Sequence, residues 1–152
     1  MMQDSRTRLV VYFDGVCNLC NRFVDFLVRI DRARVLRYAP IQGETARARG
    51  IYDAAREPVP GSIVVQRDVA ERDVVQRDVA ERDGERWTES DAVIRIFTHV
   101  GGIWSAAAIL RVVPRTLRNA VYRTVARNRY RIFGRRDTCR VPSDEEKALF
   151  LP

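Results

Sequence analysis

Short runs of apolar residues divide the chain into predicted β-strands. A run of β-branched and aromatic residues at Leu9–Phe13 predicts a buried strand. A second run at Val35–Ala39 predicts another strand, which Pro40 stops because proline cannot donate to the hydrogen-bond ladder of a sheet. A third strand is expected to begin at Ile63, with residues 85–87 as its hairpin partner.

An apolar period of 3.6 residues marks the predicted helices. The first helix follows a Cys-x-x-Cys sequence, and its apolar face consists of Phe23, Phe26, Leu27 and Ile30. A short helix is expected over Glu44–Arg49, ended by Gly50. A further helix has its apolar face at Val93, Ile96, Phe97 and Val100. Thr88 and Asp91 resemble a capping box at its start, and Gly101-Gly102 ends it.

The C-terminal third is expected to be helical at first and irregular afterwards. Helices are predicted over residues 103–113 and 115–127. In the second helix the apolar residues Leu117, Val121 and Val125 recur at helical spacing and are expected to point inward. From residue 128 to residue 152 the chain is expected to be irregular, with a short helix from Ser143.

Strands and helices alternate, which predicts an α/β protein with a small mixed sheet flanked by helices. Residues 1–152 are enough for one domain, and we expect residues 103–152 to form a helical and irregular extension packed on it. Residues 64–73 are repeated identically at 74–83, with a weaker period of five residues inside each copy. A step of five keeps neither a helical nor a strand face, so we interpret 64–83 as a duplicated insertion that lengthens a surface hairpin.

Charge is unevenly distributed along the chain. The formal net charge is +7, and most of the excess of basic over acidic residues lies in the last third of the chain. Nearly all basic residues are arginines, since Lys147 is the only lysine. No apolar run approaches the roughly 18 residues of a membrane span, and the N-terminus lacks the pattern of a signal peptide. We therefore expect a cytoplasmic protein, in which a cysteine pair is more often catalytic or metal-binding than a permanent cross-link.

The sequence Cys17-Asn18-Leu19-Cys20 stands between a predicted strand and a predicted helix, which is the thioredoxin arrangement. This spacing places both sulfurs on one helical turn. The unpaired N–H groups and the dipole at the helix N-terminus stabilise a thiolate at the first cysteine. We therefore predict that Cys17 attacks a substrate disulfide and that Cys20 resolves the mixed disulfide.

Four further residues are candidates near this pair. Asp14 either tunes the thiols or accepts backbone hydrogen bonds as a turn residue, and Gly15 permits a positive φ or a close approach of backbone. Pro60 precedes the third strand, where thioredoxin-like folds commonly place a cis-proline facing the disulfide. Cys139, flanked by arginines, either exchanges with the pair or is a small buried apolar residue.

A structural zinc site is an alternative use of the same thiols. Cys17, Cys20, His99 and Cys139 would supply the three sulfurs and one nitrogen of a Cys₃His site. However, such sites usually combine two closely spaced pairs of ligands, and His99 and Cys139 are forty residues apart. We therefore assign no residue to a metal.

Residues 12–20, YFDGVCNLC, resemble the signature of the DCC family of predicted thiol-disulfide oxidoreductases, which is named for its aspartate and two cysteines. Other motifs with counterparts in that family are Glu89–Ala92, Gly101-Gly102, Val113-Pro114, Asn119–Tyr122, Ala126–Arg131, Phe133-Gly134, Cys139 and Pro142. The resemblance covers essentially the whole chain, although residues 64–83 are longer than the family hairpin. It implies a thioredoxin-like α/β fold and a site formed by Asp14, Cys17 and Cys20.

Motif and resemblance together predict an enzyme, a thiol-disulfide oxidoreductase that acts on protein or small-molecule disulfides. No cofactor is expected beyond the redox-active Cys17–Cys20 disulfide, which an unidentified electron donor would reduce again. Neither a membrane nor a nucleic acid is expected as a partner. The alternatives are a polyanion-binding or nucleic-acid-binding module that uses the basic C-terminal third, and the structural zinc protein.

Overall fold

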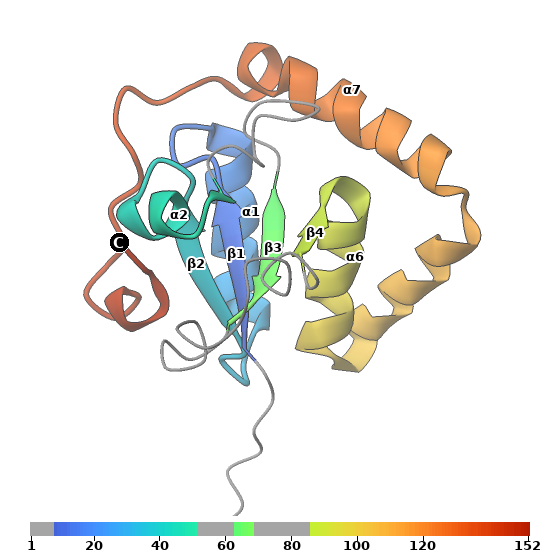
Figure 1. The fold of residues 1–152 in the computed structure, drawn as a ribbon, viewed down its shortest axis with the longest axis horizontal. Helices are drawn as coiled ribbons and strands as arrows, with labels where there is room; N and C mark the ends of the chain where they lie inside the picture. The colour runs from blue at the N-terminus through green and yellow to red at the C-terminus, as the bar shows by residue number, and fades with distance from the viewer. Residues whose placement is uncertain (1–7, 52–62, 69–85) are drawn as a thin grey trace, which may run out of the picture.

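A mixed four-stranded sheet forms the centre of the protein (Figure 1). The computed structural model describes residues 8–51, 63–68 and 86–152. The strands are β1 (Leu9–Phe13), β2 (Leu36–Pro40), β3 (Val64–Arg67) and β4 (Arg86–Thr88). They lie in the order β2-β1-β3-β4, in which β1 and β2 are parallel and the other two pairs are antiparallel.

The predicted strands are present with small shifts at their ends. β1 has the predicted bounds, whereas β2 begins one residue later than expected and includes Pro40 as its last residue. The predicted hairpin is confirmed, since Val65 of β3 pairs with Trp87 of β4. Residues 69–83 of the duplicated insertion lie outside the described residues.

Helices cover both faces of the sheet (Figure 1). They are α1 (Asn18–Ile30), α2 (Glu44–Ala48), α6 (Glu89–Val100), the 3₁₀ helix η1 (Gly102–Val112), α7 (Arg115–Phe133) and the 3₁₀ helix η2 (Lys147–Leu149). α1 and α6 contribute to the hydrophobic cluster on one face, and α2 contributes to the cluster on the other. η1 and the start of α7 lie on the far side of α6 from β2.

Alternating residues of β1 fill these two clusters. Leu9, Val11 and Phe13 pack with α1 and α6, whereas Val10 and Tyr12 pack with α2. Successive side chains of a strand point to opposite faces, so a strand that is covered on both sides consists of apolar residues throughout. The predicted fold class, a thioredoxin-like α/β arrangement with a small mixed sheet and a helical C-terminal part, is confirmed.

The apolar face of α1 is rotated relative to the prediction. Cys20, Val24 and Leu27 are its buried apolar residues, at positions i, i+4 and i+7. Phe26 is 38 % exposed and contacts Phe97 and Trp104 with ring centroids 6.3 Å and 5.2 Å away. The aromatic residues of α1 therefore form a side contact with α6 and η1, while smaller residues face the sheet.

The predicted capping box at the start of α6 is wrong. Thr88 is the N-cap residue, but its side chain makes no capping hydrogen bond. Asp91 instead forms ion pairs with Arg115 at 2.8 Å and with Arg118 at 2.9 Å, which attach the start of α7 to α6. Gly101 ends α6 as predicted, with the positive φ of 81° that glycine adopts without steric cost.

α7 is longer than predicted and packs with a different face. It continues to Phe133, so residues 128–133 are helical rather than irregular. The predicted inward residues Leu117, Val121 and Val125 are 57 %, 61 % and 43 % exposed. The buried residues of α7 are instead Asn119, Ala126 and Arg129.

The C-terminal tail returns to the edge of the sheet beside β2. Phe150 forms a parallel bridge with Tyr38, and the N–H of Leu151 donates to the Tyr38 carbonyl at 2.8 Å. The short helix expected from Ser143 is the 3₁₀ turn η2, which begins later, at Lys147. Between α7 and η2, residues 134–140 run past the start of α1, where the two cysteines lie.

Candidate functional site

Cys17 is the N-cap residue of α1, at the end of the turn that follows β1. Its backbone is extended, with φ −82° and ψ 122°, and its N–H donates to the Asp14 carbonyl at 3.2 Å. The sulfur of Cys17 accepts a hydrogen bond from the backbone N–H of Cys20 at 3.5 Å. This N–H is one of the groups that have no partner within a helix, so the first turn of α1 is electrostatically suited to a thiolate.

The pKa values of the two thiols are shifted in opposite directions. The pKa of Cys17 is lowered to about 6, chiefly by the hydrogen bond with the Cys20 side chain and further by the Cys20 backbone N–H and by Arg129. The pKa of Cys20 is raised, because Cys20 donates to Cys17 and because it is buried. Since the thiolate is the nucleophile, Cys17 is the attacking sulfur that this geometry favours.

Residues 134–140, which we call the covering segment, lie over the cysteine turn. Its two closest backbone contacts run from the N–H of Arg136 to the Val16 carbonyl at 2.8 Å and from the N–H of Arg140 to the Gly15 carbonyl at 3.2 Å. Arg135 forms an antiparallel bridge with Cys17. Beneath these contacts Cys17 is 0 % exposed, and Cys20, one turn further along α1, is 6 % exposed.

Asp14 is a buried carboxylate with a hydrogen-bond partner on each side. One oxygen accepts from the Val16 N–H at 3.2 Å and from the Gln42 amide at 2.8 Å. The other accepts from Arg129 at 3.3 Å and from the Tyr130 hydroxyl. Asp14 is thus a turn residue, as one interpretation of the sequence had it, and it is also the partner of a cation.

Arg129 connects α7 to the dithiol. Its side chain is 5 % exposed and that of Asp14 is 2 % exposed, so the ion pair is fully buried. Arg129 lowers the pKa of both Cys17 and Cys20 through its positive charge. Tyr130 completes the cluster: burial, followed by the hydrogen bond to Asp14, raises the pKa of its hydroxyl, which keeps the proton that it donates.

Cys139 lies on the other side of the same turn. Its sulfur is 3.1 Å from the position that a Cβ on Gly15 would occupy, so a larger residue at 15 would push against the thiol. The thiol also contacts the Gln42 side-chain oxygen at 4.0 Å. Gln42 therefore joins Cys139 to Asp14, and the covering segment brings the third cysteine to the edge of the site.

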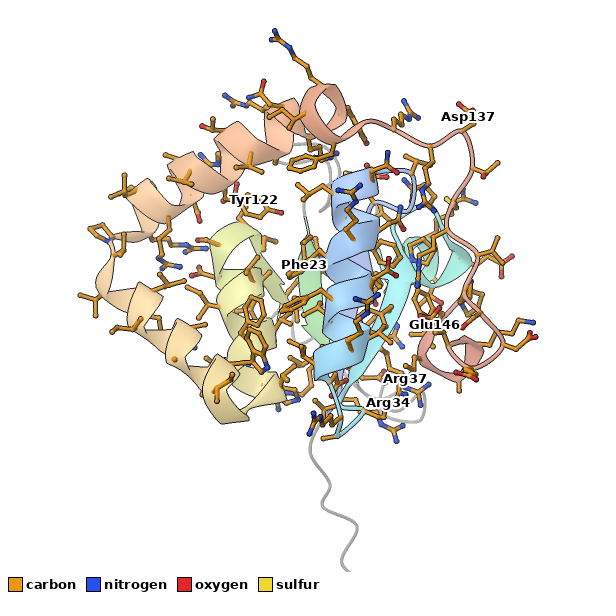
Figure 2. All side chains as sticks on the ribbon, turned by 180° about the vertical axis from the view of Figure 1, so that it is seen from behind. Phe23, Arg34, Arg37, Tyr122, Asp137 and Glu146 are labelled. Carbon is orange, nitrogen blue, oxygen red and sulfur yellow. The ribbon has the colours of Figure 1, made fainter. Side chains whose placement is uncertain are left out.

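A mostly apolar pocket of about 240 Å³ opens beside Cys20. Its lining includes Cys20 and Phe23 of α1, Val93 of α6, and Tyr122 and Arg129 of α7. Figure 2 shows Phe23 between α1 and α6, and Tyr122 on the side of α7 that faces the sheet. The Tyr122 hydroxyl accepts from the Ile63 N–H at 2.9 Å, which fixes α7 against the start of β3.

Two further candidates came from the sequence, Pro60 and His99. Pro60 lies outside the described residues. His99 is in the last turn of α6, and among the described residues no three histidine, cysteine or acidic side chains are grouped as metal ligands would be. The four-residue zinc set is therefore not assembled in the part of the chain that the structure describes.

Sequence reasoning did not place Gln42, Arg129 or Tyr130 beside the dithiol, although Arg129 and Tyr130 lie in the family motif Ala126–Arg131. Gln42 follows β2, and the parallel pairing of β1 with β2 places the ends of both strands at one edge of the sheet. That pairing is a signal that a polar residue after β2 can meet Asp14. Arg129 and Tyr130 stand in a helix rich in arginine, where no local pattern distinguishes a buried arginine from an exposed one.

Reduced protein is expected to show thiolate absorbance that rises with an apparent pKa of about 6, well below the ordinary value of a thiol. Because the folded pKa of Cys17 is the lower one, its contribution to stability is present at alkaline pH and is lost as pH falls through about 6. Ultraviolet titration of the Cys139→Ser variant measures the thiolate pKa without a contribution from the third thiol. A single transition at the ordinary thiol pKa would contradict the assignment.

A dithiol at the junction of a strand and a helix, on a four-stranded mixed sheet, defines a thioredoxin-like thiol protein. The chain belongs to the DCC1-like thiol-disulfide oxidoreductase family, whose model matches residues 11–135. The matched region contains Asp14, both cysteines, Arg129 and Tyr130, and it ends before Cys139. The family resemblance that the sequence motifs indicated is therefore confirmed.

Two curated relatives have similar sequences. The chain is 33 % identical over 143 residues to the uncharacterized protein YuxK of Bacillus subtilis strain 168, covering 94 % of this chain and 93 % of the relative. It is also 33 % identical over 133 residues to the DCC family protein At1g52590, chloroplastic, of Arabidopsis thaliana, covering 87 % and 69 %. No solved structure matches the chain. Within the described residues, no helix is both long and apolar enough to cross a bilayer.

Proposed function

We propose that the protein is an enzyme that exchanges disulfides through Cys17 as the nucleophile and Cys20 as the resolving thiol. The observation that carries the proposal is the position of the Cys17 sulfur, which accepts the Cys20 N–H at the start of α1. Membership of the thiol-disulfide oxidoreductase family supports a redox role for this pair. No metal or organic cofactor enters the proposal, because a dithiol itself stores the two electrons of the reaction.

The proposed reaction has two exchange steps. The Cys17 thiolate attacks one sulfur of the substrate disulfide, forms a mixed disulfide and releases the other substrate sulfur as a thiolate. Cys20 then loses its proton and attacks the Cys17 sulfur, which forms the Cys17–Cys20 disulfide and releases the second substrate sulfur. The substrate gains two electrons, and the leaving thiolates take up the protons from solvent.

The raised pKa of Cys20 suits the resolving role in this sequence. While Cys17 is a thiolate, Cys20 keeps its proton and donates it in the hydrogen bond between the two sulfurs. Once Cys17 is part of a mixed disulfide, the charge that holds this proton is gone, so the pKa of Cys20 falls. Cys20 thereby becomes nucleophilic only after the first step.

Asp14 acts as a positioning residue in the proposed mechanism. Both of its oxygens already accept hydrogen bonds, so its role is to hold Arg129 and Tyr130 beside the dithiol rather than to accept the Cys20 proton. Arg129 then supplies positive charge to the developing thiolates. Gly15 and Cys139 are accessory, because together they set how closely the covering segment lies on the turn.

The substrate of the proposed reaction is a protein disulfide or a small-molecule disulfide, and a separate electron donor returns the dithiol to its reduced form. We place the reaction in the cytoplasm, where reducing conditions keep such pairs available. The alternative of a nucleic-acid-binding module in place of an enzyme loses support from Arg115, Arg118, Arg123 and Arg129, because these four already form ion pairs with acidic groups of the same chain.

A redox titration tests the proposal. Equilibration in buffers of graded thiol and disulfide ratio, followed by alkylation and mass spectrometry, should show Cys17 and Cys20 passing together between thiol and disulfide in one two-electron transition. The Cys139→Ser variant should give the same transition. A Cys17–Cys20 pair that stays reduced, or stays oxidised, across the whole range of buffers would leave the proposal without support.

A further inference from the structure

The exposed apolar residues of this protein are concentrated in one region. Eleven large hydrophobic residues are exposed among those described, and nine of them lie between residues 103 and 132. These nine are Ile103, Ile109, Leu110, Val112, Leu117, Val121, Val125, Tyr130 and Ile132. Scattered apolar residues are normal on a surface, but a concentration of them on two consecutive helices indicates a site of interaction. We call residues 102–133, which comprise η1 and α7, the arm.

η1 is covered on one side only, where Trp104 contacts Phe26 and Phe97. None of its eleven residues is buried, although its sequence, GIWSAAAILRV, contains only one charged side chain. Ile103, Ile109 and Val112 are 81 %, 73 % and 83 % exposed. An apolar helix normally buries one face against a neighbour, so η1 has a face that the chain itself leaves unpartnered.

α7 has a buried face and an exposed apolar stripe that adjoins it, since Val125 of the stripe lines the pocket beside Cys20 together with Ala126 and Arg129. Asn119, Ala126 and Arg129 face the body of the protein and are buried. The exposed residues Leu117, Val121, Val125 and Ile132 follow one another at steps of four, four and seven, which places them in one stripe along the helix. Leu117 and Val121 also line an apolar pocket of about 450 Å³ together with Leu110 of η1 and Ile94 of α6, so the first half of the stripe borders the hollow between η1, α7 and α6.

The charge of the arm has a single sign. Residues 102–133 contain no aspartate, glutamate or lysine, and they contain Arg111, Arg115, Arg118, Arg123, Arg127, Arg129 and Arg131. Ion pairs with Asp91, Glu89 and Asp14 hold four of these. Arg111, Arg127 and Arg131 are exposed and form no ion pair with any residue that the structure describes.

We propose that the arm lies on an anionic lipid surface. Helices that bind in the plane of a bilayer combine an exposed apolar face with arginines or lysines and lack acidic residues, because the apolar side chains enter the acyl boundary while the cations meet lipid phosphates. η1 and α7 provide both components. The expectation from the sequence that a membrane is not a partner considered only spanning segments, and binding in the interface needs none.

Charge complementarity also separates this partner from two others. Two copies of the arm carry the same positive charge, so face-to-face contact between them is repulsive. A nucleic acid would satisfy the arginines but would leave Ile103, Ile109 and Val112 in water. An anionic bilayer is the partner that removes the apolar residues from water and neutralises the arginines at the same time.

Co-sedimentation with lipid vesicles tests the proposal on the full chain. Wild-type protein is expected to bind vesicles of phosphatidylcholine mixed with phosphatidylglycerol, to bind vesicles of phosphatidylcholine alone about tenfold or more weakly, and to be released by high salt. The double variants Ile109→Gln/Val112→Gln and Arg127→Glu/Arg131→Glu should each lose about tenfold or more of this binding. All four positions are exposed, so the fold should tolerate these changes.

Matched controls separate binding through the arm from a general effect of surface hydrophobicity or net charge. Val141→Gln changes a residue that is 84 % exposed outside the arm, and Arg22→Glu/Arg29→Glu makes the same charge change on α1. Both controls should bind mixed vesicles as wild type does. Equal losses in arm and control variants would overturn the proposal. So would a dimer in solution that Ile109→Gln/Val112→Gln disrupts while mixed vesicles fail to bind.

Discussion

Cys17→Ser is expected to abolish disulfide exchange, and Cys20→Ser is expected to stop the reaction at a mixed disulfide. Without the Cys17 sulfur, α1 keeps only Cys20, which is 6 % exposed and has no second thiol on this turn with which to complete the exchange. Without Cys20, the first step still takes place but nothing on α1 displaces the substrate. Turnover of a fluorescent disulfide substrate measures the loss, and non-reducing electrophoresis or intact-mass spectrometry detects the trapped adduct.

Cys139 provides the matched control for this experiment, because its sulfur contacts the turn at Gly15 without being part of the helical pair. Cys139→Ser should keep turnover, and Cys20→Ser/Cys139→Ser should trap the same adduct as Cys20→Ser. Full turnover by Cys17→Ser would contradict the proposed function. An adduct that appears only after Cys139 is also replaced would instead identify Cys139 as a second resolving thiol.

The central strand and the cysteine turn could be predicted from the sequence because their signals are local. Leu9–Phe13 is apolar at every position, since both of its faces are covered, and the Cys-x-x-Cys follows directly. The N-cap role of Cys17 follows from the same stretch of chain. A local signal also indicated that Gly101 ends α6, where a positive φ is required.

Periodicity did not predict which face of α7 is covered. Leu117, Val121 and Val125 follow a helical period, and the period correctly predicted a helix. However, a period identifies an apolar face without saying what lies against it. In the structure, the ion pairs of Asp91 with Arg115 and Arg118 fix the start of α7 so that the apolar stripe is exposed.

The cluster around Asp14 depends on contacts across the chain. Asp14 and Arg129 are separated by 115 positions, and the helix that carries Arg129 contains five other arginines. The burial of Cys17 depends in the same way on the covering segment, which pairs with the turn through Arg135 and Arg136. Contacts between residues so far apart in the sequence leave no local pattern in composition or periodicity, so they could not be predicted.

The ion pair between Asp14 and Arg129 should have the largest effect on stability. Asp14→Ala removes one member of a buried pair and leaves the Arg129 guanidinium, 5 % exposed, without its carboxylate. Breaking such a pair costs about 3–5 kcal/mol, because the remaining charge stays buried without compensation. Urea unfolding of the reduced protein measures the loss. Asp144→Asn, which removes a partner of Lys147 on the surface, is the control and should change stability by less than about 0.5 kcal/mol.

Arg129→Met distinguishes the electrostatic role of the pair from its role in folding. Asp14→Asn and Arg129→Met should each lower the free energy of unfolding. The double variant Asp14→Asn/Arg129→Met should lose less than the sum of the two single losses, because it leaves no unpaired charge. The pKa of Cys17 should rise in Arg129→Met, since the arginine stabilises the thiolate, but not in Asp14→Asn, which keeps the arginine. Equal pKa values of Cys17 in wild type and Arg129→Met would mean that Arg129 supports the fold without acting on the dithiol.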